Sequence, residues 1–232
     1  MDKLTEGMLW YLVFLLSTTA HEAAHAFTAM KLGDRTAYQG GQVTLDPVPH
    51  IKREPLGMVV MPILSFLTGG WMIGWASTPY DPQWAHRYPK RSAWMSLAGP
   101  AANLSLVLLA ALTIRIGMAL HIFHAPQTVN ALRVTLSDSE GALSFIAMLL
   151  SLVFTLNLIL FVFNMIPLPP LDGSGALPLL LDEELARRYT NVVHHARFGF
   201  IGLLIAWQLF GAVYRPIRLF ALNLLYPGAG YH

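Results

Sequence analysis

Residues 8–30 read MLWYLVFLLSTTAHEAAHAFTAM, a mostly apolar run with two histidines and one glutamate near its end. A helix of about 20 apolar residues is long enough to cross the hydrocarbon core of a bilayer. Ionisable side chains are costly at that depth, and those that occur there usually have a functional role. The stretch therefore predicts a first membrane-spanning helix that carries a functional site.

The composition of the whole chain is typical of a membrane protein. Of the 232 residues, 55% are hydrophobic and 12% are charged, and the mean hydropathy is +0.51. A soluble domain carries about 25% charged residues, whereas lipid can solvate an apolar surface. The net charge is only +2, and no basic run indicates a nucleic-acid partner. The absence of cysteine excludes disulfides and thiol catalysis.

Three further apolar stretches are candidates for membrane spans. They cover residues 93–120, 142–164 and 198–214, and Arg215 with Pro216 is expected to close the last one. We therefore expect an all-α, polytopic membrane protein with four transmembrane helices. It should form one domain over residues 1–232, with a core at 8–181 and a C-terminal helical region at 182–232. The first helix should remain in the mature protein, because residues 1–7 lack a basic segment and a cleavage site.

Two segments between these helices have different patterns. Residues 57–77 are apolar but contain Pro62 and the pair Gly69-Gly70, which predict a re-entrant or partial segment. Residues 41–46 alternate apolar and polar side chains, which predicts a short β-strand.

The sequence His21-Glu22-Ala23-Ala24-His25 has the spacing of a metal site on a helix. Positions i and i+4 lie on one helix face, so both imidazoles can reach one ion, and Glu22 can act as a general base toward water. Chance produces this pattern in about one chain in a hundred of this length. Its location inside an apolar helix argues against chance, and we interpret it as a site for one Zn²⁺ ion per chain.

A catalytic zinc ion has three protein ligands and one open position. The third predicted ligand is Asp172, in the sequence NMIPLPPLDG at residues 164–173, where prolines end the third span. The alternative role for Asp172 is to cap the helix that follows it. Its combination with the histidine motif favours metal ligation.

The motif at residues 21–25, together with Asn164-x-x-Pro167-x-Pro169-x-Leu171-Asp172-Gly173, resembles the site-2 protease family of intramembrane zinc metalloproteases. Further matches indicate its short bacterial-type branch, which has no PDZ or CBS domain. They are LDPVPHI at 45–51, PLG at 55–57, GWA at 74–76 and AGPAAN at 98–103. After the last residue of GWA, this branch commonly reads Lys-Pro-Val-Pro-Val, whereas this chain has Ser77-Thr78-Pro79-Tyr80-Asp81.

The resemblance implies that His21, His25 and Asp172 bind zinc and that Glu22 activates water. It implies cleavage of transmembrane protein substrates after their helices unwind locally, and the predicted strand near the active site could pair with the unwound segment. It also implies a substrate or oxyanion contact for Asn164 and a position near the site for His50. The alternatives are an interhelical hydrogen bond for Asn164 and a bond to the loop backbone for His50.

Other polar positions are expected to be structural. Asn103 should pack and hydrogen-bond between helices, and Arg115 should extend its charged end toward the bilayer surface. His194-His195 should lie in a solvated interface.

The proposed ligands restrict the topology. Asp172 can meet the two histidines only if an even number of crossings separates them, and the spans at 93–120 and 142–164 supply two. Residues 57–77 should therefore not cross. Seven Lys and Arg residues then lie between residues 31 and 92, against Arg133 alone in the next loop. The positive-inside rule puts the site toward the cytoplasm, and the resemblance implies a bacterial cell membrane.

The function that these patterns predict is that of an intramembrane zinc metalloprotease, a multi-pass protein of the lipid bilayer. One alternative is a zinc or ion transporter that uses the same ligands. Transporters typically contain inverted repeats, and the sequence shows none. The other alternative is a catalytically inactive membrane scaffold, which would not need Glu22.

The topology can be tested with single cysteines, because the chain has no native cysteine. Cysteines at Gln42 and Gln83 should react with a membrane-impermeant maleimide from one side, the cytoplasmic one, and a cysteine at Thr128 from the other. Labelling of Gln42 and Gln83 from opposite sides would mean that residues 57–77 cross the membrane.

Overall fold

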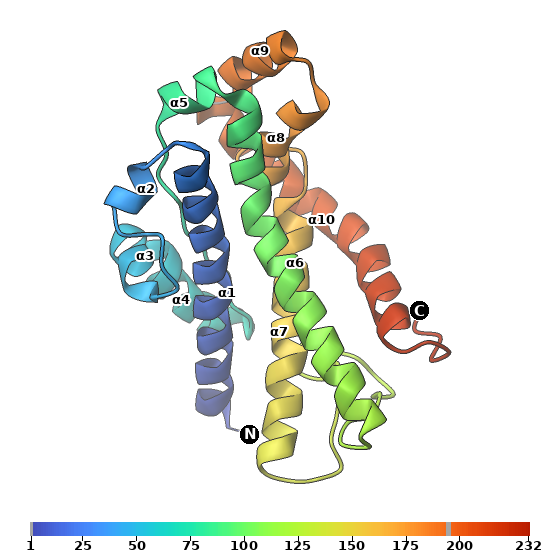
Figure 1. Cartoon of the computed structure of the whole chain (residues 1–232). Coiled ribbons are helices and arrows are strands. Elements are labelled where there is room, and N and C mark those ends of the chain that lie inside the picture. The colour runs from blue at the N-terminus through green and yellow to red at the C-terminus, as the bar shows by residue number, and fades with distance from the viewer. Residues whose placement is uncertain (1, 194–195) are drawn as a thin grey trace.

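Figure 1 shows a bundle of long helices with shorter helices at its side and at one end. This computed structural model describes residues 2–193 and 196–232, so His194-His195 lies outside the described residues. The long helices are α1 (Lys3–Leu32), α6 (Pro89–Ala119), α7 (Ala142–Asn164) and α10 (Ala196–Leu225). The shorter elements are α2 (Thr36–Gln39), α3 (Pro47–Arg53), a π-helix (Leu56–Val60), α4 (Met61–Gly69), α5 (Pro82–Arg87), α8 (Asp172–Ala176), a 3₁₀ helix (Leu177–Leu180) and α9 (Glu183–Val193).

The long helices run alternately up and down in the view of Figure 1. α6 packs against both α1 and α7, which also contact each other, and α10 packs against α7. α5, α8 and α9 lie at the upper end of the view, and both chain termini lie toward the lower part. The second half of α1 is therefore brought to the same end of the bundle as α8.

The start and end of α1 follow from local chemistry. The Asp2 carboxylate accepts a hydrogen bond from the Thr5 backbone N–H at 2.7 Å, and this bond lowers the pKa of Asp2. Gly33 ends the helix with a positive φ of 110°, and its N–H bonds to the carbonyls of Ala29 and Met30.

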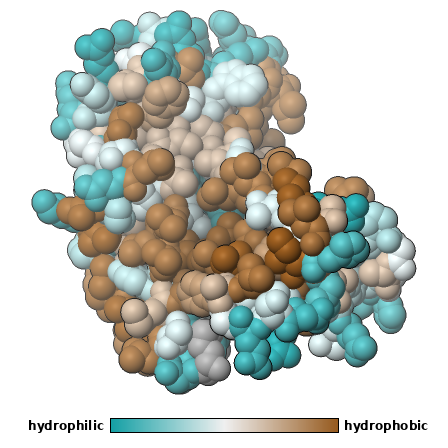
Figure 2. Space-filling view, turned by 60° about the horizontal axis from the view of Figure 1, so that its bottom comes forward, coloured by the Kyte–Doolittle hydropathy of each residue, from teal (hydrophilic) through white to brown (hydrophobic). Residues whose placement is uncertain are grey.

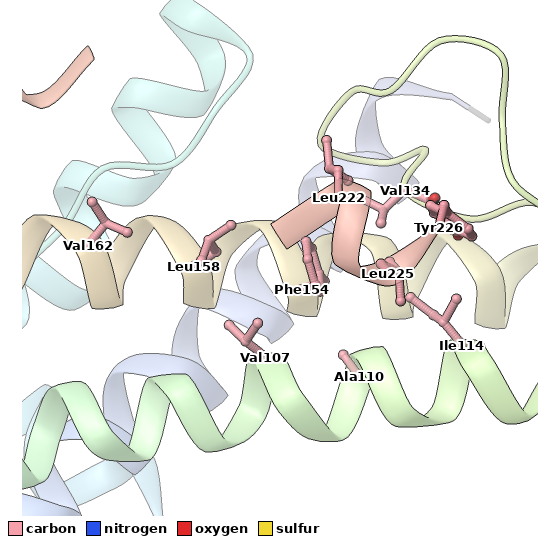
Figure 3. Packing of buried hydrophobic residues seen from close by; sticks show 10 residues of the cluster. All are labelled: Val107, Ala110, Ile114, Val134, Phe154, Leu158, Val162, Leu222, Leu225 and Tyr226. Carbon is pink, nitrogen blue, oxygen red and sulfur yellow. Dashed lines mark hydrogen bonds between the residues drawn. The ribbon is translucent and has the colours of Figure 1, made fainter. Parts of the chain in front are cut away.

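The core beside the second half of α7 joins three long helices. Figure 3 shows its members: Val107, Ala110 and Ile114 of α6, Phe154, Leu158 and Val162 of α7, Leu222 and Leu225 of α10, with Val134 and Tyr226. A second buried cluster packs the first half of α1 against Leu152 and Leu156 of α7 and against Phe66 and Met72. These clusters fix α1, α6 and α7 relative to one another.

The predicted count of four transmembrane helices is not confirmed. By length and hydropathy, α6, α7 and residues 199–225 of α10 can each cross a membrane, and no other helix within the described ranges meets both criteria. α1 has 30 residues, about 45 Å at 1.5 Å per residue, so its length is sufficient. Its hydropathy is too low, because residues 17–19 and the motif at 21–25 are polar.

The limits of the third span are confirmed at both ends, whereas the end of the fourth is wrong. Arg215 and Pro216 do not close α10, which continues to Leu225. A proline in a helix interior costs about 3 kcal/mol. Burial of Leu222 and Leu225 in the core offsets this cost, since each buried leucine contributes about 1.5–3 kcal/mol.

Residues 56–77 fold back on themselves, as predicted for the apolar segment at 57–77. The helical part, Leu56–Gly69, is shorter than the roughly 20 residues of a full span and ends at Gly70, whose φ is 74°. The chain then returns along this helix, because Trp75 N–H donates to the Gly57 carbonyl at 3.1 Å and Ile73 N–H to Ser65 Oγ at 2.8 Å. We call residues 56–69 with this return segment, 70–81, the hairpin.

The predicted β-strand at residues 41–46 is wrong, and the part of the chain that the structure describes contains no strand. These residues form a turn in which Gln42 N–H bonds to the Ala37 carbonyl at 2.9 Å. Gly41 has a φ of 72°, which breaks an extended course. Residues 41–46 have no neighbouring strand with which to form a ladder. Their conformation is instead stabilised by local hydrogen bonds.

The exterior of the long helices is apolar. Figure 2 shows a broad hydrophobic region between hydrophilic patches. Large exposed side chains on α6 and α10 include Leu108, Leu109, Leu112, Phe200, Ile201 and Trp207. Soluble monomers rarely expose such continuous apolar surface, so these faces are consistent with contact with lipid.

The close approach within the hairpin can be tested with Gly57→Ala. A Cβ at residue 57 would overlap the Trp75 carbonyl oxygen, and relief of this overlap should cost about 1–3 kcal/mol and lower the midpoint of thermal unfolding in detergent. Gly211→Ala in α10 is the control, because its Cβ meets nothing within 4 Å. A midpoint equal to that of the wild type in Gly57→Ala would contradict the packing described.

Candidate metal centre

His21 and His25 lie on the face of α1 that packs against α6. Both side chains are buried, their rings meet edge to face at a centroid distance of 4.6 Å, and their Nε2 atoms are 3.0 Å apart. The i, i+4 spacing on one helix produces this convergence, as the sequence predicts.

Hydrogen bonds to α6 fix the tautomer of both rings. Nδ1 of His21 lies 2.5 Å from Oδ1 of Asn103, and Nδ1 of His25 lies 2.7 Å from the Met95 carbonyl. Each of these partners is an acceptor, so each Nδ1 carries the proton and donates it. The Nε2 atoms of both rings therefore keep their lone pairs free.

The orientation of the Asn103 amide is itself determined by a buried network. Asn103 Nδ2 donates to Asn157 Oδ1 at 2.8 Å and to the Ser17 carbonyl at 3.3 Å. Asn157 Nδ2 donates in turn to Ser17 Oγ at 2.9 Å. Asn103 and Asn157 are fully buried, so these bonds join α1, α6 and α7 and direct Asn103 Oδ1 toward His21.

Asp172 reaches the two histidines from the first residue of α8. Its Oδ2 lies 3.0 Å from His21 Nε2 and its Oδ1 lies 3.4 Å from His25 Nε2. The chain turns tightly between Met165 and Gly173. A Cβ on Gly173 would collide with the backbone of Met165 and Ile166, so only glycine fits at this position. Thus a carboxylate 151 positions from His21 in the sequence joins the same cluster.

A glycine lets α6 approach the cluster. A Cβ on Gly99 would collide with Nε2 of His25 and of His21. This position therefore excludes every residue with a side chain unless α1 and α6 move apart.

Glu22 lies beside the histidines and contacts the return segment of the hairpin. Its Oε2 accepts a hydrogen bond from Thr78 Oγ1 at 2.7 Å. The possible ligand atoms of His21, Glu22 and His25 all lie within 4.8 Å of one another. Among the described residues, these three side chains form a cluster that is close enough to hold a metal ion.

The donor set fits a tetrahedral zinc ion. Two imidazole nitrogens and a carboxylate are the ligands of many catalytic zinc sites, and bonds of about 2.0–2.1 Å imply donor separations of about 3.3–3.4 Å. The two Nε2 atoms are 3.0 Å apart, and the carboxylate faces them with different oxygens: Oδ2 is 3.0 Å from His21 Nε2 and Oδ1 is 3.4 Å from His25 Nε2. A proton on one imidazole or a bound cation would offset the repulsion among these groups, and zinc is a cation that this set of side chains suits.

The two predicted substrate contacts lie outside this cluster of hydrogen bonds. Asn164 Nδ2 donates to the Leu160 carbonyl of its own helix at 3.0 Å. His50 is buried and its Nε2 lies 3.1 Å from the Thr44 carbonyl, which matches the backbone bond considered as its alternative. Their contacts with substrate stay predictions.

The sequence interpretation missed several residues of the site. Asn103 does make the expected interhelical bonds, but it also orients His21, and Gly99 and Thr78 were not identified as contacting the site. A buried amide in each of two apolar helices, at Asn103 and Asn157, was the available signal, because such groups need a partner. Arg115 donates to the Leu225 carbonyl at 3.1 Å, so it is bound to α10 at the end of α6.

Known proteins resemble this chain along most of its length. A protein of Bacillus subtilis (strain 168) named "Putative zinc metalloprotease YwhC" is 28% identical over 232 residues, which cover 91% of this chain and 95% of that protein. A protein of Mycobacterium tuberculosis (strain H37Rv) named "Putative zinc metalloprotease Rip2" is 29% identical over 205 residues, 87% of this chain and 70% of that protein. A protein of the same name in Mycolicibacterium smegmatis is 31% identical over 174 residues, which cover 75% of this chain and 58% of that protein.

No solved structure matches the chain significantly. The sequence model of peptidase family M50 matches residues 9–207, a range that includes both histidines, Glu22 and Asp172. The chain therefore belongs to peptidase family M50, the site-2 protease family.

Proposed function

We propose that this protein is an intramembrane zinc metalloprotease that hydrolyses peptide bonds within or near transmembrane segments of membrane proteins. Membership in a peptidase family and relatives named as zinc metalloproteases support a zinc-dependent protease. The single domain would extend over residues 1–232.

One observation carries the proposal. His21 Nε2, His25 Nε2 and the Asp172 carboxylate converge as three acceptors at 3.0–3.4 Å, with both imidazoles held in the metal-binding tautomer. We assign these residues as the zinc ligands and Glu22 as the general base. Three ligands leave one position of a tetrahedral ion open for chemistry.

Zinc, when bound, supplies a Lewis acid that makes water more acidic and polarises a peptide carbonyl. Glu22 takes one proton as the water oxygen adds to the peptide carbon, and it passes that proton to the leaving amide nitrogen as the C–N bond breaks. Asn103 and the Met95 carbonyl keep the imidazoles in place during both proton transfers.

The apolar exterior supports substrates within the bilayer. α6, α7 and α10 are long and apolar enough to cross a membrane, and both histidines and Glu22 lie on α1, which packs against α6 and α7. A substrate helix hides its carbonyls in its own hydrogen bonds, so it must unwind locally before the peptide carbon can react.

The charge distribution supports a site that opens toward the cytoplasm of a bacterial cell. α5, α9 and the start of α6 lie at the end of the bundle that also holds α8 (Figure 1). These elements contain Arg87, Lys90, Arg91, Arg187 and Arg188. Basic residues gather on the cytoplasmic side of membrane proteins.

Zinc content tests the ligand assignment. The purified protein should contain about one zinc per chain, and the triple variant His21→Ala, His25→Ala, Asp172→Ala should contain almost none, measured by elemental analysis. The matched control removes a second His–Asp pair, His124 and Asp138, which lie 3.6 Å apart and exposed on a loop. Full zinc retention in the triple variant would overturn the assignment.

The role of Glu22 is tested by Glu22→Gln. The variant should keep its zinc and its fold but cleave a transmembrane test substrate in detergent about 100- to 10,000-fold more slowly, because it cannot accept the proton. Inhibition of the wild type by 1,10-phenanthroline is the metal control. Turnover at the wild-type rate in Glu22→Gln would refute the mechanism.

A further inference from the structure

We propose that Thr78 is a positioning residue that holds the Glu22 carboxylate in its working orientation. The proposal rests on the function proposed above, because it assigns Glu22 as the base. It concerns a hydroxyl on the return segment of the hairpin, far from the histidine motif in the sequence.

The contact between Thr78 and Glu22 is direct. Thr78 Oγ1 lies 2.7 Å from Glu22 Oε2 and 2.9 Å from the Glu22 carbonyl. A hydroxyl has one proton and can donate only one strong bond at a time. The carboxylate is the better acceptor, because a charged acceptor makes a hydrogen bond about twice as strong as a neutral one.

The residue before Thr78 is anchored on its other side, so the hydroxyl has a defined position. Ser77 Oγ donates to Glu54 Oε1 at 2.6 Å and accepts from Arg53 Nε at 3.2 Å. The buried Gln42 side chain donates to the Ser77 carbonyl at 3.3 Å. These bonds tie the return segment to the loop around α3 and leave the Thr78 side chain directed at α1.

This anchoring has a chemical consequence for Glu22. A bond to Oε2 restricts rotation of the Glu22 carboxylate about the bond that joins it to the side chain. Catalysis depends on a base held in the reactive geometry, and small misplacement of such a group lowers the rate strongly. The hydroxyl therefore acts on the rate through Glu22 and need not touch substrate or metal.

Two variants separate positioning from packing. Thr78→Val keeps the shape of the side chain and removes the hydroxyl, and Thr78→Ser keeps the hydroxyl. Thr78→Val should lower kcat about 10- to 100-fold with KM, zinc content and thermal midpoint unchanged, and Thr78→Ser should restore most of the rate. The matched control is Thr68→Val in the same hairpin, where the exposed hydroxyl bonds to the Leu64 carbonyl at 2.8 Å.

A spectroscopic measurement that does not depend on substrate cleavage tests the Thr78–Glu22 contact independently of the proposed protease function. The infrared difference spectrum between wild type and Glu22→Gln isolates the Glu22 carboxylate band in the zinc-loaded protein. This band should shift in Thr78→Val and keep its position in Thr78→Ser and Thr68→Val. A shift together with an inactive wild type would support the contact and overturn only the proposed function.

Three results would overturn the positioning role. They are an unshifted carboxylate band in Thr78→Val, a kcat equal to that of Thr68→Val, and a loss of zinc or of thermal stability that accounts for the lost rate. The last result would mean that the hydroxyl serves only to fasten the hairpin to α1.

Discussion

The convergence of three acceptor atoms in a buried place is the constraint on which the rest of the structure depends. His21 Nε2, His25 Nε2 and the Asp172 carboxylate lie 3.0–3.4 Å apart, a spacing that suits a zinc ion held between them. The cation would join α1 to α8 across 151 positions of the sequence. Metal binding and the docking of α8 would therefore be linked, since binding energy at a site formed by folding contributes to the stability of the fold.

The same site explains why α1 is less apolar than the helices around it. Its polar half faces α6, α7 and the hairpin, where each buried polar group needs a partner because no water is at hand. Ser17, Asn103 and Asn157 satisfy one another and direct one oxygen at His21. Hydropathy measures how well lipid tolerates a helix, and a helix enclosed by protein can carry a polar network that a lipid-facing helix cannot.

The sequence predicted the parts of the structure that depend on uninterrupted local patterns. The limits of α7 followed from an unbroken apolar run, and the residues proposed as zinc ligands followed from the i, i+4 spacing and the proline-rich break before Asp172. The end of α10 was mispredicted because tertiary packing of Leu222 and Leu225 outweighs Pro216. The contributions of Gly99 and Thr78 were missed because their contacts come from elements distant in sequence, and no periodic pattern marks them.

The topology and the chemistry of the site depend on one property of the hairpin. Glu22 lies in the second half of α1, and the chain reaches Thr78 only after passing through residues 56–77. The bond of 2.7 Å between them requires the chain to return to the end from which it left. A full crossing by residues 57–77 would place Thr78 and Asp172 at the opposite end from the histidines. The close backbone contact of Gly57 with residues 74 and 75 holds this return, and with it the position of Thr78 beside Glu22.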